Sequence, residues 1–76
     1  NAQKRETAQL VQKAIMELPA DIRSAVLLRD IEQLSYEEVA KILNVPVGTA
    51  KSRVHRGRQL LKERLEQILG REFVAE

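Results

Sequence analysis

The residues best suited to chemistry form a cluster of basic side chains in the C-terminal half of the chain. Residues 51–64 contain six basic residues and one acidic residue, so this segment has a net charge of +5. Ammonium and guanidinium groups donate hydrogen bonds to phosphate and to the exposed edges of bases. The cluster therefore indicates binding of a polyanion. Its basic members are Lys51, Arg53, Arg56, Arg58, Lys62 and Arg64.

Other kinds of chemistry are poorly supported. The chain has no Cys and a single His, His55, so it can form neither a disulfide framework nor a thiolate or multi-histidine metal site. No titratable residues stand in a recognisable nucleophile or acid–base arrangement, and there is no glycine-rich phosphate loop. We expect a protein that is not an enzyme and that needs no metal or cofactor.

The charge of the whole chain hides a strong polarity. The 76 residues have a formal net charge of only +2, yet residues 17–41 hold six acidic residues against three basic ones, a net charge of −3. A basic patch beside an acidic one orients a domain on a polyanion as well as attracting it. We find no secretory signal and no apolar stretch near the roughly 20 residues that cross a bilayer. We expect one small soluble domain, 1–76, inside the cell; because it begins with Asn, we suspect a piece of a longer protein.

Helix-forming residues dominate, and Gly and Pro fall mostly where helices would begin or end. The pattern predicts an all-α domain of four helices, at about 4–17, 19–33, 36–43 and 47–69. Pro19 would lie in the first turn of the second helix. That helix is apolar on two sides, with Ile22 and Val26 on one and Leu27 and Ile31 on the other. It is either the central helix of the core, which we favour, or presents an apolar face to a partner.

The third and fourth helices have the clearest boundaries. Ser35 and Glu38 match a capping box, in which each side chain accepts a hydrogen bond from the other residue's backbone N–H. Asn44 suits the left-handed conformation that ends helices, and Pro46 prevents simple continuation. A short capped helix followed by a tight turn and a long basic helix is a helix-turn-helix arrangement. In the long helix, helical periodicity predicts a buried apolar stripe that includes Val54, Leu61 and Leu65. Gly57 falls on this stripe, which indicates close helix packing.

The long helix presents its donors on the side that faces away from this stripe. Taking 100° per residue, Lys51, Ser52, His55 and Arg56 point outward, and no carboxylate joins them before Glu63. Such groups read base edges in the major groove of DNA. Arg53 and Arg58 would lie on the flanks, where phosphates pass. Tyr36, in the first turn of the preceding helix, could offer its hydroxyl to a phosphate.

Several motifs at consistent spacing resemble domain 4 of extracytoplasmic-function sigma factors, over about residues 18–65. They are Leu18-Pro19, Arg23, Leu34-Ser35-Tyr36-Glu37-Glu38-Val39-Ala40, Val45-Pro46-Val47-Gly48-Thr49-Ala50-Lys51-Ser52-Arg53 and His55-Arg56-Gly57-Arg58. In that family this domain inserts its last helix into the major groove of the −35 promoter element. Earlier helices bind the flap of the RNA polymerase β subunit, and an anti-sigma factor often occupies the same domain.

The resemblance implies a role for each matching residue. Base contacts would come from Lys51, Ser52, His55 and Arg56, and phosphate contacts from Arg29, Tyr36, Thr49, Arg53 and Arg58. By analogy, Ile22, Val26 and Leu28 would meet a polymerase or anti-sigma partner. Position 55 departs from the family, in which an aromatic is common there. The expected partners are double-stranded promoter DNA, the RNA polymerase core and an anti-sigma factor, bound by a cytoplasmic monomer that does not insert into membranes.

Two other interpretations remain. A LuxR-type response-regulator output domain is also a four-helix DNA binder, but Leu18-Pro19 and the string from Lys51 to Arg58 resemble the sigma pattern more closely. Alternatively, the basic helix could bind an acidic protein, with the two-sided second helix as a docking surface. The sigma family's domain 2, which binds the −10 element and melts DNA, has no counterpart among these residues.

Overall fold

The computed structural model describes residues 2–70, with side chains from Thr7 onward. The predicted domain, 1–76, therefore extends at both ends beyond the described residues. Within them the fold is helical without strands, and counting α2 and η1 as one continuous helix gives the four helices that the sequence predicted. The elements are α1 (Ala2–Met16), α2 (Ala20–Val26), η1 (Leu27–Ile31), α3 (Tyr36–Leu43) and α4 (Val47–Leu69).

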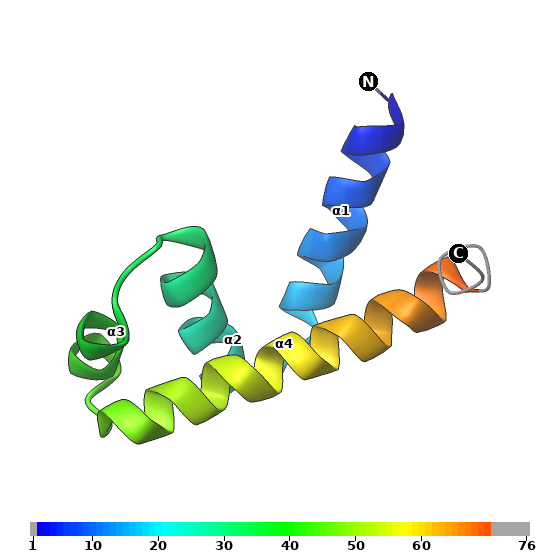
Figure 1. Ribbon diagram of the computed structural model, residues 1–76. Coiled ribbons are helices and arrows are strands. Elements are labelled where there is room, and N and C mark those ends of the chain that lie inside the picture. Colours follow the sequence, from blue (N-terminus) through cyan, green and yellow to red (C-terminus); the bar gives the residue numbers. More distant parts are fainter. Residues whose placement is uncertain (1, 71–76) are drawn as a thin grey trace.

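The long helix α4 is the element on which the others assemble. Its 23 residues span about 34 Å at 1.5 Å per residue, close to the 39 Å long dimension of the molecule. Helices α1, α2 and α3 all pack on it, with α3 near its beginning and α1 over its C-terminal half (Figure 1). The expectation that the second helix would be central is wrong, since α4 makes the contacts that join the fold.

The second helix also differs from its predicted course. Pro19 precedes the helix as its N-cap instead of lying in the first turn. From Leu27 the chain winds as a π-helix, closed by a hydrogen bond from the Glu32 N–H to the Leu27 carbonyl (3.0 Å). The helix ends at Ile31, and Gln33 adopts a left-handed φ of 62°. The wider π turn changes which residues of this segment face α4 and which face away.

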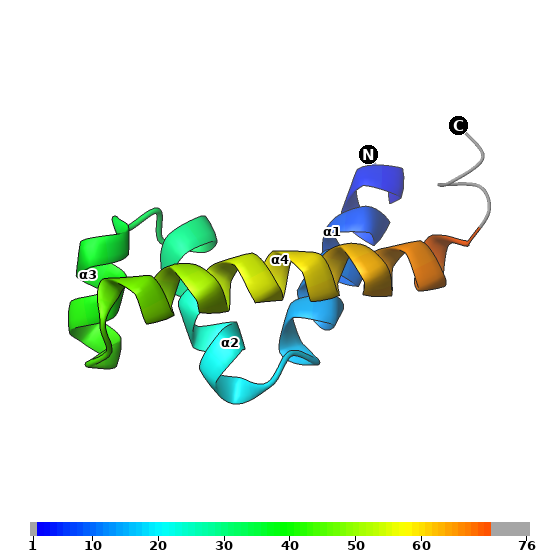
Figure 2. The ribbon, with the colours of Figure 1, turned by 60° about the horizontal axis from the view of Figure 1, so that its bottom comes forward.

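The predicted helix-turn-helix is confirmed in detail. The Glu38 N–H donates to Ser35 Oγ (3.1 Å) and the Ser35 N–H donates to Glu38 Oε1 (2.9 Å), which completes the capping box. Asn44 ends α3 in the left-handed conformation, with φ 58° and ψ 49°. Pro46 then serves as the N-cap of α4. Asn44 and Pro46 together form the turn between α3 and the beginning of α4 (Figure 2).

The core lies between α2, α3 and the first half of α4. Its buried cluster consists of Ala25, Val39, Ala40, Ala50 and Val54. Small residues dominate it, so the helices approach one another closely. The closest approach is at Gly57, where a β-carbon would overlap Val26 Cγ2 and lie 2.9 Å from Ile22 Cγ2. Gly57 is thus a packing residue, as the sequence indicated.

Candidate nucleic-acid interface

The outer face of α4 presents four donors that the sequence singled out. Lys51, Ser52, His55 and Arg56 are all exposed, and together with Gln59 and Tyr36 they line one hollow of about 480 Å³. For Ser52, His55 and Arg56, the described part of the chain supplies no hydrogen-bond or ion-pair partner. Their donors are therefore available to an external ligand. Gln59 had no role in the sequence analysis; its exposed amide, one turn beyond His55, extends the same face.

Tyr36 joins this face to α3. Arg29 lies over the Tyr36 ring, with its guanidinium carbon 4.6 Å from the ring centroid, and Lys51 Nζ lies 5.7 Å from the same centroid. Both distances fall within the range in which a cation is attracted to an aromatic face. The half-buried ring thus positions Lys51 at the start of the donor face. The predicted phosphate contact of the Tyr36 hydroxyl stays a prediction.

Arg29 is placed inside the domain more than its predicted role suggests. The side chain is half-buried, and its Nη1 donates to the Leu34 carbonyl (2.9 Å) across the turn between η1 and α3. Its Nε is buried and has no hydrogen-bond partner among the described residues. In this arrangement Arg29 stabilises the turn through its hydrogen bond to Leu34 and packs on the ring of Tyr36. A phosphate contact from Arg29 is untested, and it would have to use the remaining end of the guanidinium.

Arg58, on one flank of α4, is held by a carboxylate. It donates from Nε to Asp30 Oδ2 (3.0 Å) and from Nη2 to Asp30 Oδ1 (2.5 Å), a two-pronged pair between α4 and η1. The hydrogen bond from Arg58 is the main cause that lowers the pKa of Asp30, and the same bond raises the pKa of Arg58. The Tyr36 hydroxyl lies near enough to raise the pKa of Arg58 further. The sequence placed Arg58 on a flank but gave no sign of this pair.

The other predicted phosphate contacts lie near the opposite flank and the helix start. Arg53 is half-buried and its Nε lies 3.9 Å from Asp21 Oδ2, a much looser pair than that of Arg58. Thr49 is half-buried in the first turn of α4. Backbone N–H groups at a helix beginning favour anions, so this position is compatible with a phosphate, and both contacts stay predictions.

Comparison with known proteins agrees with this geometry. The family model described as Sigma-70, region 4 matches residues 8–61, a span that contains α2, α3, the turn and the donor face of α4. The chain belongs to the sigma-70 region 4 family. This match, together with the ECF relatives described next, confirms the resemblance to domain 4 of extracytoplasmic-function sigma factors.

Individual relatives of this region 4 domain support the same assignment. It is 41% identical over 63 residues to the ECF RNA polymerase sigma factor SigW of Bacillus subtilis, a match that covers 83% of this chain and 34% of the relative. It is also 41% identical over 66 residues to the ECF RNA polymerase sigma-E factor of Escherichia coli, covering 87% of this chain and 35% of the relative. The chain therefore spans about one third of the length of the relatives it matches.

One residue of the predicted partner surface, Val26, needs correction, whereas Ile22 and Leu28 stay predictions. Val26 is only 1% exposed because it packs against Gly57 of α4, and Ile22 and Leu28 are half-buried. The sequence showed two apolar faces on this helix but not which of them faces inward. An open apolar groove of about 400 Å³ lies between α1 and η1. We call it the α1–η1 groove; its lining residues are Ala8, Val11, Gln12, Ile15, Met16, Leu27 and Ile31.

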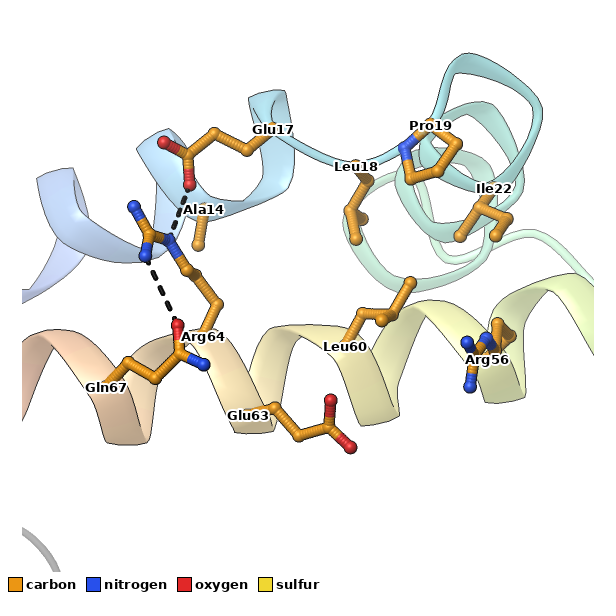
Figure 3. Close-up of a pocket in the computed structure, with 10 residues that line it drawn as sticks. All are labelled: Ala14, Glu17, Leu18, Pro19, Ile22, Arg56, Leu60, Glu63, Arg64 and Gln67. Atoms are coloured by element: carbon orange, nitrogen blue, oxygen red, sulfur yellow. Dashed lines mark hydrogen bonds and ion pairs between the residues drawn. The ribbon is translucent and has the colours of Figure 1, made fainter.

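A further hollow, of about 600 Å³, is lined by residues of α1, α2 and α4 and of the turn between α1 and α2 (Figure 3). At one end Arg64 donates from Nε to Glu17 Oε1 (2.9 Å) and from Nη1 to Gln67 Oε1 (3.3 Å). The bond from Arg64 is the main cause that lowers the pKa of Glu17. Arg56 lies at the other end (Figure 3). The ion pair therefore fastens α1 along α4 at a distance from the donor face.

No metal cluster is present among the described residues, and none of their helices is long and apolar enough to span a membrane.

Proposed function

We propose that this chain is the −35-reading domain of a sigma factor, and that it inserts α4 into the major groove of promoter DNA. The exposed donor face formed by Lys51, Ser52, His55 and Arg56 is the observation on which the proposal mainly depends. Arginine and lysine bind guanine O6 and N7, and serine and histidine add shorter-range donors or acceptors. The family supports the same use of this helix.

Residues on the two flanks of α4 would set the position of this helix in the major groove of DNA. Arg53 and Arg58 lie on either side of the donor face, and Tyr36 and Thr49 lie beside its beginning. Phosphate contacts fix register and orientation without carrying sequence information. We expect three to four phosphates to be contacted at once, which gives a slope of log K against log salt of about −3 to −4.

The decisive experiment is selection of bound duplexes from a random pool, followed by titration of a recovered duplex and a scrambled duplex at several salt concentrations. We expect a recovered consensus, preferential binding to it, and the slope given above. If no sequence is enriched and the slope is near zero, the DNA-binding proposal fails. The interpretation as a module that binds an acidic protein would then gain support.

A single domain with one reading face binds weakly by itself, so we further propose that it works while attached to RNA polymerase. Tethering raises the effective concentration of a weak module without new contacts. On this proposal the protein acts as a monomer in the cytoplasm, where polymerase and promoter meet, and these residues perform no catalysis. The relatives' names, which include RNA polymerase, support this partner.

The α1–η1 groove is our candidate for the polymerase flap or an anti-sigma factor. Met16 and Ile31, at its rim, are about 60% exposed, so apolar surface is open there. We expect Ile31→Ala to weaken binding of the flap or the inhibitor while leaving duplex binding unchanged. Ile42→Ala is a matched control, because Ile42 is 59% exposed on α3 and lies outside the groove. Equal effects of the two substitutions would remove the groove from the proposal.

A further inference from the structure

The carboxylate of Asp30 lies beside Arg58, one of the cations that we expect to contact DNA. Asp30 of η1 receives two hydrogen bonds from Arg58, and the side chains are 31% and 47% exposed. A negative charge at this place opposes the approach of any phosphate. The contact joins residues 28 positions apart in the chain, so it is a product of the packing of η1 on α4.

We propose that Asp30 is a specificity-determining residue: it neutralises Arg58 in the free domain, which lowers attraction to duplexes in general, and it holds the guanidinium where a correctly docked duplex presents a phosphate. This inference depends on the proposed DNA binding and deepens it. Asp30 itself need not touch DNA, since it acts through Arg58.

The geometry of the pair allows both effects together. Arginine has five N–H donors in a rigid fork, and Asp30 occupies one on Nε and one on Nη2. Three N–H donors remain, two on Nη1 and one on Nη2, and the Tyr36 hydroxyl lies near this guanidinium. These donors can bind a phosphate while the carboxylate stays in place. A guanidinium that is already oriented loses less rotational freedom when it binds.

The neighbouring charges make this pair unlike the other two on α4. Asp21, which approaches Arg53 at 3.9 Å, is 61% exposed and makes no two-pronged contact. The Glu17 pair with Arg64 is tight, but Arg64 is not a predicted phosphate contact, and the pair lies at the end of its hollow away from Arg56, the donor-face residue that lines it. Only at Arg58, among the described residues, does a firmly held carboxylate adjoin a cation predicted to bind phosphate.

The size of the effect follows from counterion release. Binding to a scrambled duplex depends on the number of phosphates that free cations neutralise, and each contributes about 0.9 to the salt slope. Replacing Asp30 by a neutral residue adds nearly one free cation. The slope should steepen by about 0.9, which strengthens binding by at most about eightfold at 0.1 M salt. On a preferred duplex the gain should be smaller, because the loss of a preset guanidinium offsets it.

The test compares wild type with Asp30→Asn, Asp30→Glu and Glu17→Gln, by titrating a selected and a scrambled duplex at several salt concentrations. Glu17→Gln makes the same charge change at an ion pair away from the donor face. Circular dichroism establishes that each variant is folded. We expect Asp30→Asn to steepen the slope on the scrambled duplex and to reduce the preference for the selected one. Asp30→Glu should stay close to wild type.

An unchanged slope in Asp30→Asn, or an equal change in Glu17→Gln, would overturn the inference while leaving the proposed function intact. A wild-type domain that binds neither duplex would overturn the proposed function and the inference with it. The two failures are therefore distinguishable from the wild-type titration alone.

Discussion

The close packing at Gly57 leads to a prediction about the stability of the domain. Two effects of the substitution Gly57→Ala oppose each other: higher helix propensity and steric overlap. Alanine is better than glycine in a helix by about 1 kcal/mol, so Gly57→Ala would stabilise α4 if there were room. There is none, because the added methyl group would overlap Val26 Cγ2 and approach Ile22 Cγ2 to 2.9 Å. Val26 is β-branched and almost fully buried, so its side chain cannot turn away.

Overpacking of this kind costs about 1–3 kcal/mol. Set against the gain in helix propensity, we expect Gly57→Ala to lower the free energy of unfolding by up to about 2 kcal/mol, a fall in Tm of at most about 15 °C for a domain of this size. Equilibrium unfolding in urea, followed by circular dichroism at 222 nm, measures the difference.

Two further variants separate overlap from other causes. Gly48 lies in the first turn of α4 with no atom within 4 Å of its would-be β-carbon, so Gly48→Ala should be neutral or stabilising. In Val26→Ala/Gly57→Ala the overlap is relieved, and the double variant should be more stable than the sum of the single effects predicts, by about 1 kcal/mol or more. A Gly57→Ala domain that is more stable than wild type would refute the close approach of α2 and α4.

The remaining predictions concern binding, capping and pH. Arg56→Ala should cost about 1–3 kcal/mol on a selected duplex and less on a scrambled one. Arg53→Ala, at a predicted phosphate contact with only a loose ion pair, should weaken both alike; duplex titration distinguishes base from phosphate contacts. Ser35→Ala should lower the free energy of unfolding by about 1 kcal/mol through loss of the N-cap, as urea unfolding will show. Because its pair with Arg58 lowers the pKa of Asp30 from an ordinary 3.8, the pair's stabilisation is complete above that pH and lost as the pH falls below it. Thermal unfolding between pH 5 and pH 2.5 should therefore show a smaller loss of stability for Asp30→Asn than for wild type.

Local signals explain how much of the fold was predictable. The capping box at Ser35, the left-handed Asn44 and the following Pro46 each act within a few residues, so the sequence placed α3 and the start of α4 correctly. The direction of the donor face followed from helical periodicity for the same reason. The buried position of Gly57 was also visible from its angle on the helix.

The features that the sequence did not predict correctly depend on contacts between segments that are distant in the chain. A two-sided apolar helix does not reveal which side packs inward, and so Val26 was assigned to a partner although it lies against Gly57. The π turn at Leu27–Ile31 has no local signal comparable to a cap or a proline. Likewise, nothing in the sequence indicates that Asp30 would meet Arg58, because that pairing depends on how η1 lies on α4.

These distant pairs change the meaning of the charge polarity in the sequence. The acidic segment does not simply sit beside the basic helix: Glu17, Asp21 and Asp30 each pair with an arginine of α4. Among the described residues of α4, the cations left without an ion-pair partner are Lys51, Arg56 and Lys62, and all three are exposed. Folding thus neutralises the flanks more than the centre of the helix. A domain charged in this way gains less from phosphates in general than its +5 helix suggests. On the proposed function, more of its affinity would then come from the base contacts predicted for Lys51 and Arg56.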